Sequence, residues 1–163
     1  STSGEKLQIT EACFRYAIDG VGTPVLKGKL KPNEERYMNK RTSDNDPNYT
    51  RIGDLQYHHF SFEIAESNTN IRVELQGEER IDFSIYLKKG APAFNSNADH
   101  AATGPGNNKT ITRQLTPGKW FVGVECKTTV KAELDGCRGF FNYSGKLSVL
   151  NGAAYKIKLV TNR

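Results

Sequence analysis

The chain has 163 residues, 36% of them hydrophobic, and a formal net charge of +5 at pH 7. This length suits one domain, alone or with an N-terminal extension, and such a chain can bury a core without metal or disulfide staples. No apolar run approaches a membrane helix and the basic residues mix evenly with acidic ones, so we expect neither a membrane-spanning nor a nucleic-acid-binding protein.

The first third of the chain contains two apolar runs and then a polar stretch. Within residues 5–31 the runs are separated by glycine-containing turn signals, which predicts a β-hairpin. Residues 32–56 are the most polar region and predict a long loop or a linker. We therefore divide the chain into residues 1–57, an N-terminal extension or additional strands packed on the main domain, and a main domain of residues 58–163.

The segment from residue 57 to residue 87 has the clearest pattern. Apolar and polar residues alternate in three runs, around Phe62, Val73 and Phe83, with polar turns between them. Successive side chains of a strand point to opposite faces of its sheet. The pattern therefore predicts three half-buried antiparallel strands.

The rest of the chain continues the series of strands. Residues 89–109 are rich in Gly and Asn and predict a second long loop, a kind of segment that tends to carry function. Strand-length segments follow, each bounded by Gly, Pro or Asn, at residues 110–115, 120–126, 145–150 and 155–160. About nine strands and no convincing amphipathic helix predict an all-β fold, an antiparallel β-sandwich or barrel.

The ends of the chain and its cysteines indicate its compartment only in part. The chain begins with Ser1 and has no charged-then-apolar leader, so we expect a mature or excised fragment whose export signal has been removed. Cys13, Cys126 and Cys137 allow at most one bridge within the chain. Cys126 and Cys137 could meet across a short loop, and three buried thiols are the alternative.

The order of the elements resembles a known family from His58 onward. Two strands at residues 60–64 and 71–75 precede an apolar strand that contains Asp82. A Pro-Gly-Lys-Trp-Phe turn and strand begins at Pro117, and the last strand begins near Tyr155. Over about a hundred residues this order resembles the bacterial pre-peptidase C-terminal domain, which includes the collagen-binding domains of clostridial collagenases. The family usually has a second acidic residue near Asp82, and residues 1–57 have no assigned counterpart.

The resemblance implies both a fold and a role. The fold would be a jelly-roll-like antiparallel β-sandwich. The role would be that of a secreted or cell-surface, non-catalytic domain beside an exported protease or similar enzyme, used for tethering to a substrate or surface or for folding and export. Its partner would be a protein or polysaccharide polymer or a cell-surface ligand, bound by a monomer. A carbohydrate-binding module and a free-standing surface adhesin are the alternatives.

No catalytic motif is present in the sequence. The chain lacks a Gly-x-Ser-x-Gly elbow, a His-Glu-x-x-His helix and a Gly-rich phosphate loop. Asp99, His100 and Thr103 fall close together in a loop, but no oxyanion-hole signature accompanies them. We therefore assign no catalytic residues.

One polar loop has the composition of a calcium site. Asp44, Asp46 and Asn48 alternate, and Asp54 lies nearby. Calcium takes six to eight oxygen ligands, which alternating Asp and Asn side chains can supply in part. The loop lacks the Gly and the final Glu of an EF-hand. The alternative is a turn in which these side chains accept hydrogen bonds from their own backbone.

The aromatic residues suggest a ligand-binding face. Trp120 alternates with apolar residues and is expected in the core, whereas Phe121 and Tyr86 have the opposite parity and are expected on the surface. Phe140 and Tyr143 lie in a loop-like stretch. We assign these four, Tyr86, Phe121, Phe140 and Tyr143, to a platform for a sugar ring or an extended peptide, the alternative being scattered surface aromatics.

Overall fold

The computed structural model describes residues 23–41, 46–53, 55–127 and 152–162. Nine strands and one short 3-10 helix lie in these residues. In chain order they are β1 Leu26–Lys29, β2 Glu35–Met38, η1 Pro47–Tyr49, β3 Tyr57–Ile64, β4 Thr69–Gly77, β5 Asp82–Lys89, β6 His100–Ala102, β7 Asn108–Leu115, β8 Gly118–Lys127 and β9 Tyr155–Thr161. The described part of the chain contains no helix with the length and hydrophobicity needed to cross a membrane.

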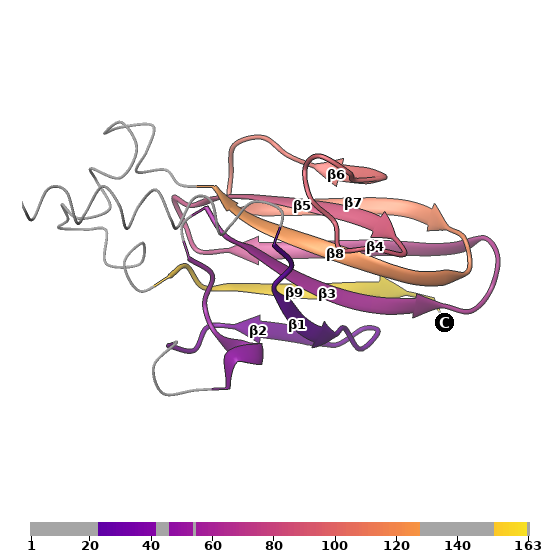
Figure 1. Cartoon of the computed structure of the whole chain (residues 1–163), viewed down its shortest axis with the longest axis horizontal. Coiled ribbons are helices and arrows are strands. Elements are labelled where there is room, and N and C mark those ends of the chain that lie inside the picture. The colour runs from indigo at the N-terminus through magenta and orange to yellow at the C-terminus, as the bar shows by residue number, and fades with distance from the viewer. Residues whose placement is uncertain (1–22, 42–45, 54, 128–151, 163) are drawn as a thin grey trace, which may run out of the picture.

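The strands form two stacked sheets (Figure 1). One has the order β1-β3-β8-β5-β6 and the other the order β2-β9-β4-β7. All neighbouring strands are antiparallel except β1 and β3, which are parallel. The prediction of an all-β, antiparallel β-sandwich with about nine strands is confirmed.

The core lies between the two sheets and is built by the predicted alternation. Phe60, Phe62 and Ile64 point inward from β3, and Val73 and the apolar residues beside it do the same from β4. Burying one such side chain stabilises the fold by about 1.5–3 kcal/mol, so the alternation supplies the main driving force for stacking the sheets. Trp120 is also buried, as expected, and its indole N–H donates to the carbonyl of Thr116 at 2.8 Å.

Two segments predicted as long loops contain strands, so those predictions were wrong in part. Residues 32–56 contain β2 and η1, and residues 89–109 contain β6. Both strands lie at sheet edges and are short. In β2 only Met38 is fully buried, and an edge strand with one buried residue leaves no alternation to detect. The predicted strands within residues 5–22 and 145–150 lie outside the described residues.

The N-terminal strands belong to the sandwich. β1 pairs with β3 in the five-stranded sheet, and β2 pairs with β9 in the four-stranded sheet. One short polar stretch of sequence therefore adds an edge strand to each layer at the same side of the molecule (Figure 1). This side is where the candidate binding face is formed.

Candidate binding face

The outer face of the five-stranded sheet is partly covered by residues 90–99, here called the cover segment. Tyr57, Tyr86 and Ala93 form a small buried cluster there, with Phe94 packed against it. The cover segment approaches closely at Gly123, because a side-chain carbon at that position would meet the carbonyl oxygen of Ala93 at 2.1 Å.

Tyr86 was therefore assigned wrongly to an exposed platform. Its parity was right, because it points to the outer face, but the cover segment leaves it 1% exposed. Its hydroxyl donates to Glu125 at 2.7 Å, and burial, helped by this hydrogen bond, raises its pKa. Phe121 is partly exposed, with the ammonium of Lys119 5.2 Å from its ring centre. Phe140 and Tyr143 lie outside the described residues.

His59 holds the cover segment to the sheet. Its ring is fully buried, accepts from the backbone N–H of Val25 at Nδ1 (3.1 Å) and donates from Nε2 to the carbonyl of Ala93 (2.9 Å). This pairing requires a neutral ring, since a proton on Nδ1 would face the N–H of Val25. Burial lowers the pKa of His59, and burial also holds the pKa of His58 well below its usual range.

The predicted calcium loop is described only in part. Asp46 accepts from the backbone N–H of Asn48 at 2.9 Å and caps η1, as in the alternative interpretation of a self-capped turn. Asp44 and Asp54 lie outside the described residues. Among the residues that the structure covers, no group of three or more His, Cys, Asp or Glu is placed to hold a metal ion. The four-residue calcium site stays a prediction.

The outer face of the four-stranded sheet carries ordered rows of polar side chains. The strand register places residues of all four strands side by side across the sheet. One row is Tyr37, Lys156, Gln76 and Asn108, and the next is Glu35, Lys158, Glu74 and Thr110. Each row offers hydrogen-bond donors and acceptors, and the second also alternates carboxylate and ammonium groups.

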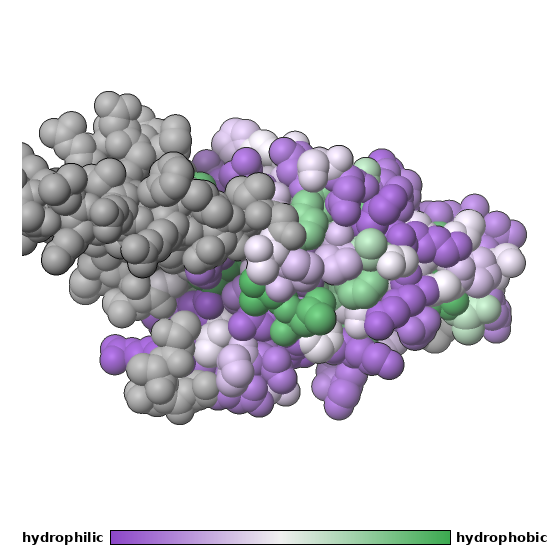
Figure 2. All heavy atoms as spheres, in the orientation of Figure 1, coloured by the Kyte–Doolittle hydropathy of each residue, from purple (hydrophilic) through white to green (hydrophobic). Residues whose placement is uncertain are grey.

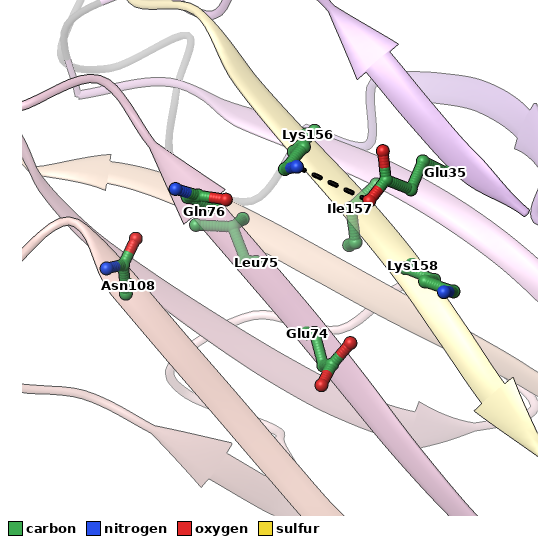
Figure 3. Close-up of a pocket in the computed structure, with 8 residues that line it drawn as sticks. All are labelled: Glu35, Glu74, Leu75, Gln76, Asn108, Lys156, Ile157 and Lys158. Carbon is green, nitrogen blue, oxygen red and sulfur yellow. Dashed lines mark hydrogen bonds and ion pairs between the residues drawn. The ribbon is translucent and has the colours of Figure 1, made fainter.

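A hollow of about 390 Å³ lies over these rows (Figure 3). Its rim includes Glu35 on β2, Lys156 on β9 and Asn108 on β7. The ammonium of Lys156 lies 3.3 Å from one carboxylate oxygen of Glu35, and the other carboxylate oxygen accepts from the hydroxyl of Tyr37. The hydrogen bond from Tyr37, followed by that from Lys156, lowers the pKa of Glu35, and the bond to Glu35 raises the pKa of Tyr37.

A second hollow of about 450 Å³ lies on the other side of β2 and shares Glu35 with the first. We call the two hollows together the β2 groove. The second hollow is lined by two tyrosines, Tyr37 and Tyr49, which are 50% and 44% exposed. Its charged lining is predominantly basic, with four cations (Lys29, Lys31, Arg36, Lys40) and two carboxylates (Glu34, Glu35). Nearby, Figure 2 shows a hydrophobic patch over β1, where Leu26 is 62% exposed.

Arg36 builds this end of the groove. Its guanidinium donates to the carbonyls of Lys27 at 2.5 Å and Asn48 at 2.6 Å, and so joins β1 to η1. It also lies 4.5 Å from the ring centre of Tyr49. Lys27 adds a second tie, since its ammonium donates to the carbonyl of Pro47 at 2.7 Å, and burial lowers its pKa.

The residues of the β2 groove were not predicted from the sequence. Tyr37, Tyr49 and Arg36 stand in the polar segment that was predicted as a loop, where no periodicity marks a face. The available signals were the basic clusters before and after β2 and the length of the polar segment. Neither signal could show that β9, about 120 residues later in the chain, pairs with β2 and completes the face.

The arrangement suits an extended ligand better than a reaction. The hollows are shallow and adjacent, their lining groups are mostly polar, and two half-exposed tyrosines are available for stacking. A polymer lying across β2 would contact both hollows. Hydrogen bonds from the rows and contacts with the tyrosine rings would then each contribute to the binding affinity along the length of the polymer.

One family model matches the central part of the chain. The family model for the bacterial pre-peptidase C-terminal domain matches residues 56–125, which run from just before β3 to near the end of β8. The predicted resemblance is confirmed for this part of the chain. Most of the β2 groove, including all its residues on β1, β2 and β9, lies outside the matched segment.

This chain is similar to several solved structures, of which two are described. One is the pre-peptidase C-terminal domain of collagenase from Bacillus anthracis, with 16% identity, a TM-score of 0.45 and coverage of 83% of this chain and 93% of that one. The other is PliG of Aeromonas hydrophila, a periplasmic inhibitor of g-type lysozyme, with 9% identity, a TM-score of 0.49 and coverage of 86% and 100%. No curated protein sequence matches this chain.

Proposed function

We propose, with the match of residues 56–125 to the pre-peptidase C-terminal domain family as premise, that this chain is a non-catalytic accessory domain of a secreted bacterial protease or similar exported enzyme. Its role is to tether that enzyme to an extended protein polymer. The ligand lies in the β2 groove, and the domain works outside the cell or at its surface.

The observation that carries this proposal is the meeting of two hollows at Glu35. Each has a volume of several hundred cubic ångströms, enough for a short piece of a chain molecule. Together they cross the edge strand β2, and the first hollow, drawn in Figure 3, continues over β9 and β4.

The charges favour a polypeptide with acidic side chains. The excess of basic over acidic groups in the second hollow attracts carboxylates. The first hollow has both signs, with Glu35 and Glu74 beside Lys156 and Lys158. Peptide amides can pair with Gln76 and the other uncharged polar groups of the rows, independently of the sequence of the ligand.

A carbohydrate-binding role is the second candidate, favoured by the tyrosines. Tyr49 has Arg36 against its ring, and Tyr37 has the ammonium of Lys156 5.9 Å from its ring centre. Both rings remain about half exposed. A sugar ring could stack on the exposed surface of either.

Retention on insoluble polymers tests the proposed function and separates the two candidates. The domain would be mixed with an insoluble acidic protein, and in parallel with cellulose and chitin, and the fraction left in solution measured. We expect retention on the protein, with weaker binding at high salt because screening reduces the attraction of the basic lining. Retention on the polysaccharides alone would favour the second candidate, and retention on none would contradict both.

A further inference from the structure

A third hollow lies on the opposite sheet, away from the β2 groove. Its volume is about 450 Å³, and we call it the Ser84 pocket. Its lining residues come from the outer face of β5, the cover segment, the turn after β6 and the end of β8: Asp82, Ser84, Tyr86, Asn95, Thr103, Gly104 and Lys127.

Ser84 is the unusual residue of this pocket. It is 1% exposed, and its hydroxyl makes no well-aligned hydrogen bond within the described ranges of the chain, although it lies close enough to the hydroxyl of Tyr86 to offset part of the rise in the pKa of that group. A buried hydroxyl without a partner is destabilising. A hydroxyl on the wall of a pocket can be satisfied by a ligand that enters it.

The charged groups around Ser84 are already paired within the protein. Asp82 accepts from the backbone N–H of Gly106 at 2.7 Å. The ammonium of Lys127 lies 3.6 Å from Glu125, which also accepts from the hydroxyl of Tyr86. The pocket therefore lacks a strong uncompensated charge on its wall. The group left to be satisfied is neutral.

The wall of the pocket is fixed before any ligand binds. Asn95 donates its backbone N–H to the hydroxyl of Tyr57 at 3.3 Å, and Asn97 closes the turn by accepting from the N–H of Phe94 at 2.7 Å. His59 holds Ala93 beneath them. A preformed wall of this kind lowers the ordering cost of binding a small molecule.

We propose that the Ser84 pocket binds a neutral polyhydroxylated ligand of about the size of one sugar ring. Each ligand hydroxyl can both donate and accept, and so can Ser84, Thr103 and the side-chain amide of Asn95. This inference does not depend on the β2 groove, because the two sites share no residue.

The test uses the full chain and a panel of glucose, galactose, mannose and N-acetylglucosamine, followed by backbone amide chemical shifts in NMR titrations. We expect at least one sugar to shift the amides of Ser84, Thr103 and Asn95. Ser84→Ala should weaken the binding of that sugar by about fivefold or more, as the loss of one hydrogen bond predicts. Ser84→Ala should also fold at least as well as wild type, because it removes an unpartnered buried hydroxyl.

Two controls keep the outcome decisive. Ser61→Ala removes a hydroxyl from the same face of the same sheet, in another row beside Phe121, and should leave sugar binding unchanged. Thr103→Val repeats the test at a second lining residue and should weaken sugar binding. The proposal is overturned if no sugar shifts these amides, if Ser84→Ala and Ser61→Ala bind equally well, or if glycine or glutamate binds there in place of a sugar.

Discussion

The guanidinium of Arg36 lies 4.5 Å from the ring centre of Tyr49 and donates to the carbonyl of Asn48, the residue before Tyr49. One side chain on an edge strand thus fixes a half-exposed ring that comes from a separate helical turn. The ring would be free to move if only its own backbone held it. The binding face depends on this connection.

Replacing Arg36 tests that dependence. Arg36→Ala should reduce the free energy of unfolding by about 2 kcal/mol, because it removes charged hydrogen bonds to the carbonyls of Lys27 and Asn48. It should also weaken polymer binding, since Tyr49 loses its support. Chemical denaturation and a binding assay measure the two effects.

Arg72 gives the matched control for stability. It lies on the same sheet but is well exposed, and its ion pair with Glu74 is a surface contact. Arg72→Ala should therefore change stability by no more than about 0.5 kcal/mol. Equal losses for the Arg36 and Arg72 variants would show that Arg36 does not anchor η1.

Gly123 should tolerate no side chain. Gly123→Ala would place a carbon 2.1 Å from the carbonyl oxygen of Ala93, so the cover segment must move. Forcing a methyl group into a packed site costs about 1–3 kcal/mol, and here the loss should come with increased exposure of Tyr86. Denaturation and tyrosine fluorescence would follow the change.

Gly104→Ala provides the comparison for that variant. Gly104 has a φ of 103° but open space around it, so alanine there meets backbone strain alone. If Gly123→Ala leaves stability and Tyr86 exposure no more affected than Gly104→Ala does, the close contact between the sheet and the cover segment is not present in solution.

The stability of the domain should fall between neutral and mildly acid pH. Burial lowers the pKa values of His58 and His59 in the folded state below the usual 6.5. The unfolded chain then binds more protons as pH falls past 6.5, so the stability present above that pH is progressively lost below it, at about 1.4 kcal/mol for each unit of lowered pKa. Urea denaturation at about pH 7.5 and 5.5 measures this difference.

The half-buried histidine, His100, supplies the control. His100→Gln should keep most of the pH dependence. Burial, followed by the charge of Arg113, also lowers the pKa of His100, but its ring is less buried than those of His58 and His59 and makes no contact with the cover segment comparable to that of His59. Carboxyl groups with lowered pKa, such as Asp99, act at lower pH. Stability that is constant from about pH 7.5 to 5.5 would contradict neutral, buried rings.

The sandwich could be predicted because its central strands have two different faces. The alternation at Phe60, Val73 and Phe83 arises because the outer face of each strand is solvated and the inner face is buried. This pattern can be read from neighbouring residues in the sequence. β2 and β6 lack it because edge strands bury little. Their position depends on pairing with strands distant in the chain.

The candidate site was less accessible to sequence reasoning. Parity placed Tyr86 correctly on the outer face, but exposure depends on what covers that face, and the cover segment is held by hydrogen bonds of His59 that no local pattern reveals. Tyr37 and Tyr49 become neighbours only when β2 and η1 fold against the sheets. The composition shows which residues are present, but it does not show which of them lie close together in the folded chain.

The most direct measurement compares the Tyr37→Ala/Tyr49→Ala double variant with Phe121→Ala in sedimentation with the insoluble acidic protein. Both changes remove exposed or partly exposed aromatic rings, but Phe121 lies on the opposite sheet. We predict that the double variant loses retention by about tenfold or more, as loss of two hot-spot rings implies, while Phe121→Ala binds like wild type. Full retention of the double variant would contradict binding in the β2 groove. Loss of retention in Phe121→Ala alone would contradict it as well.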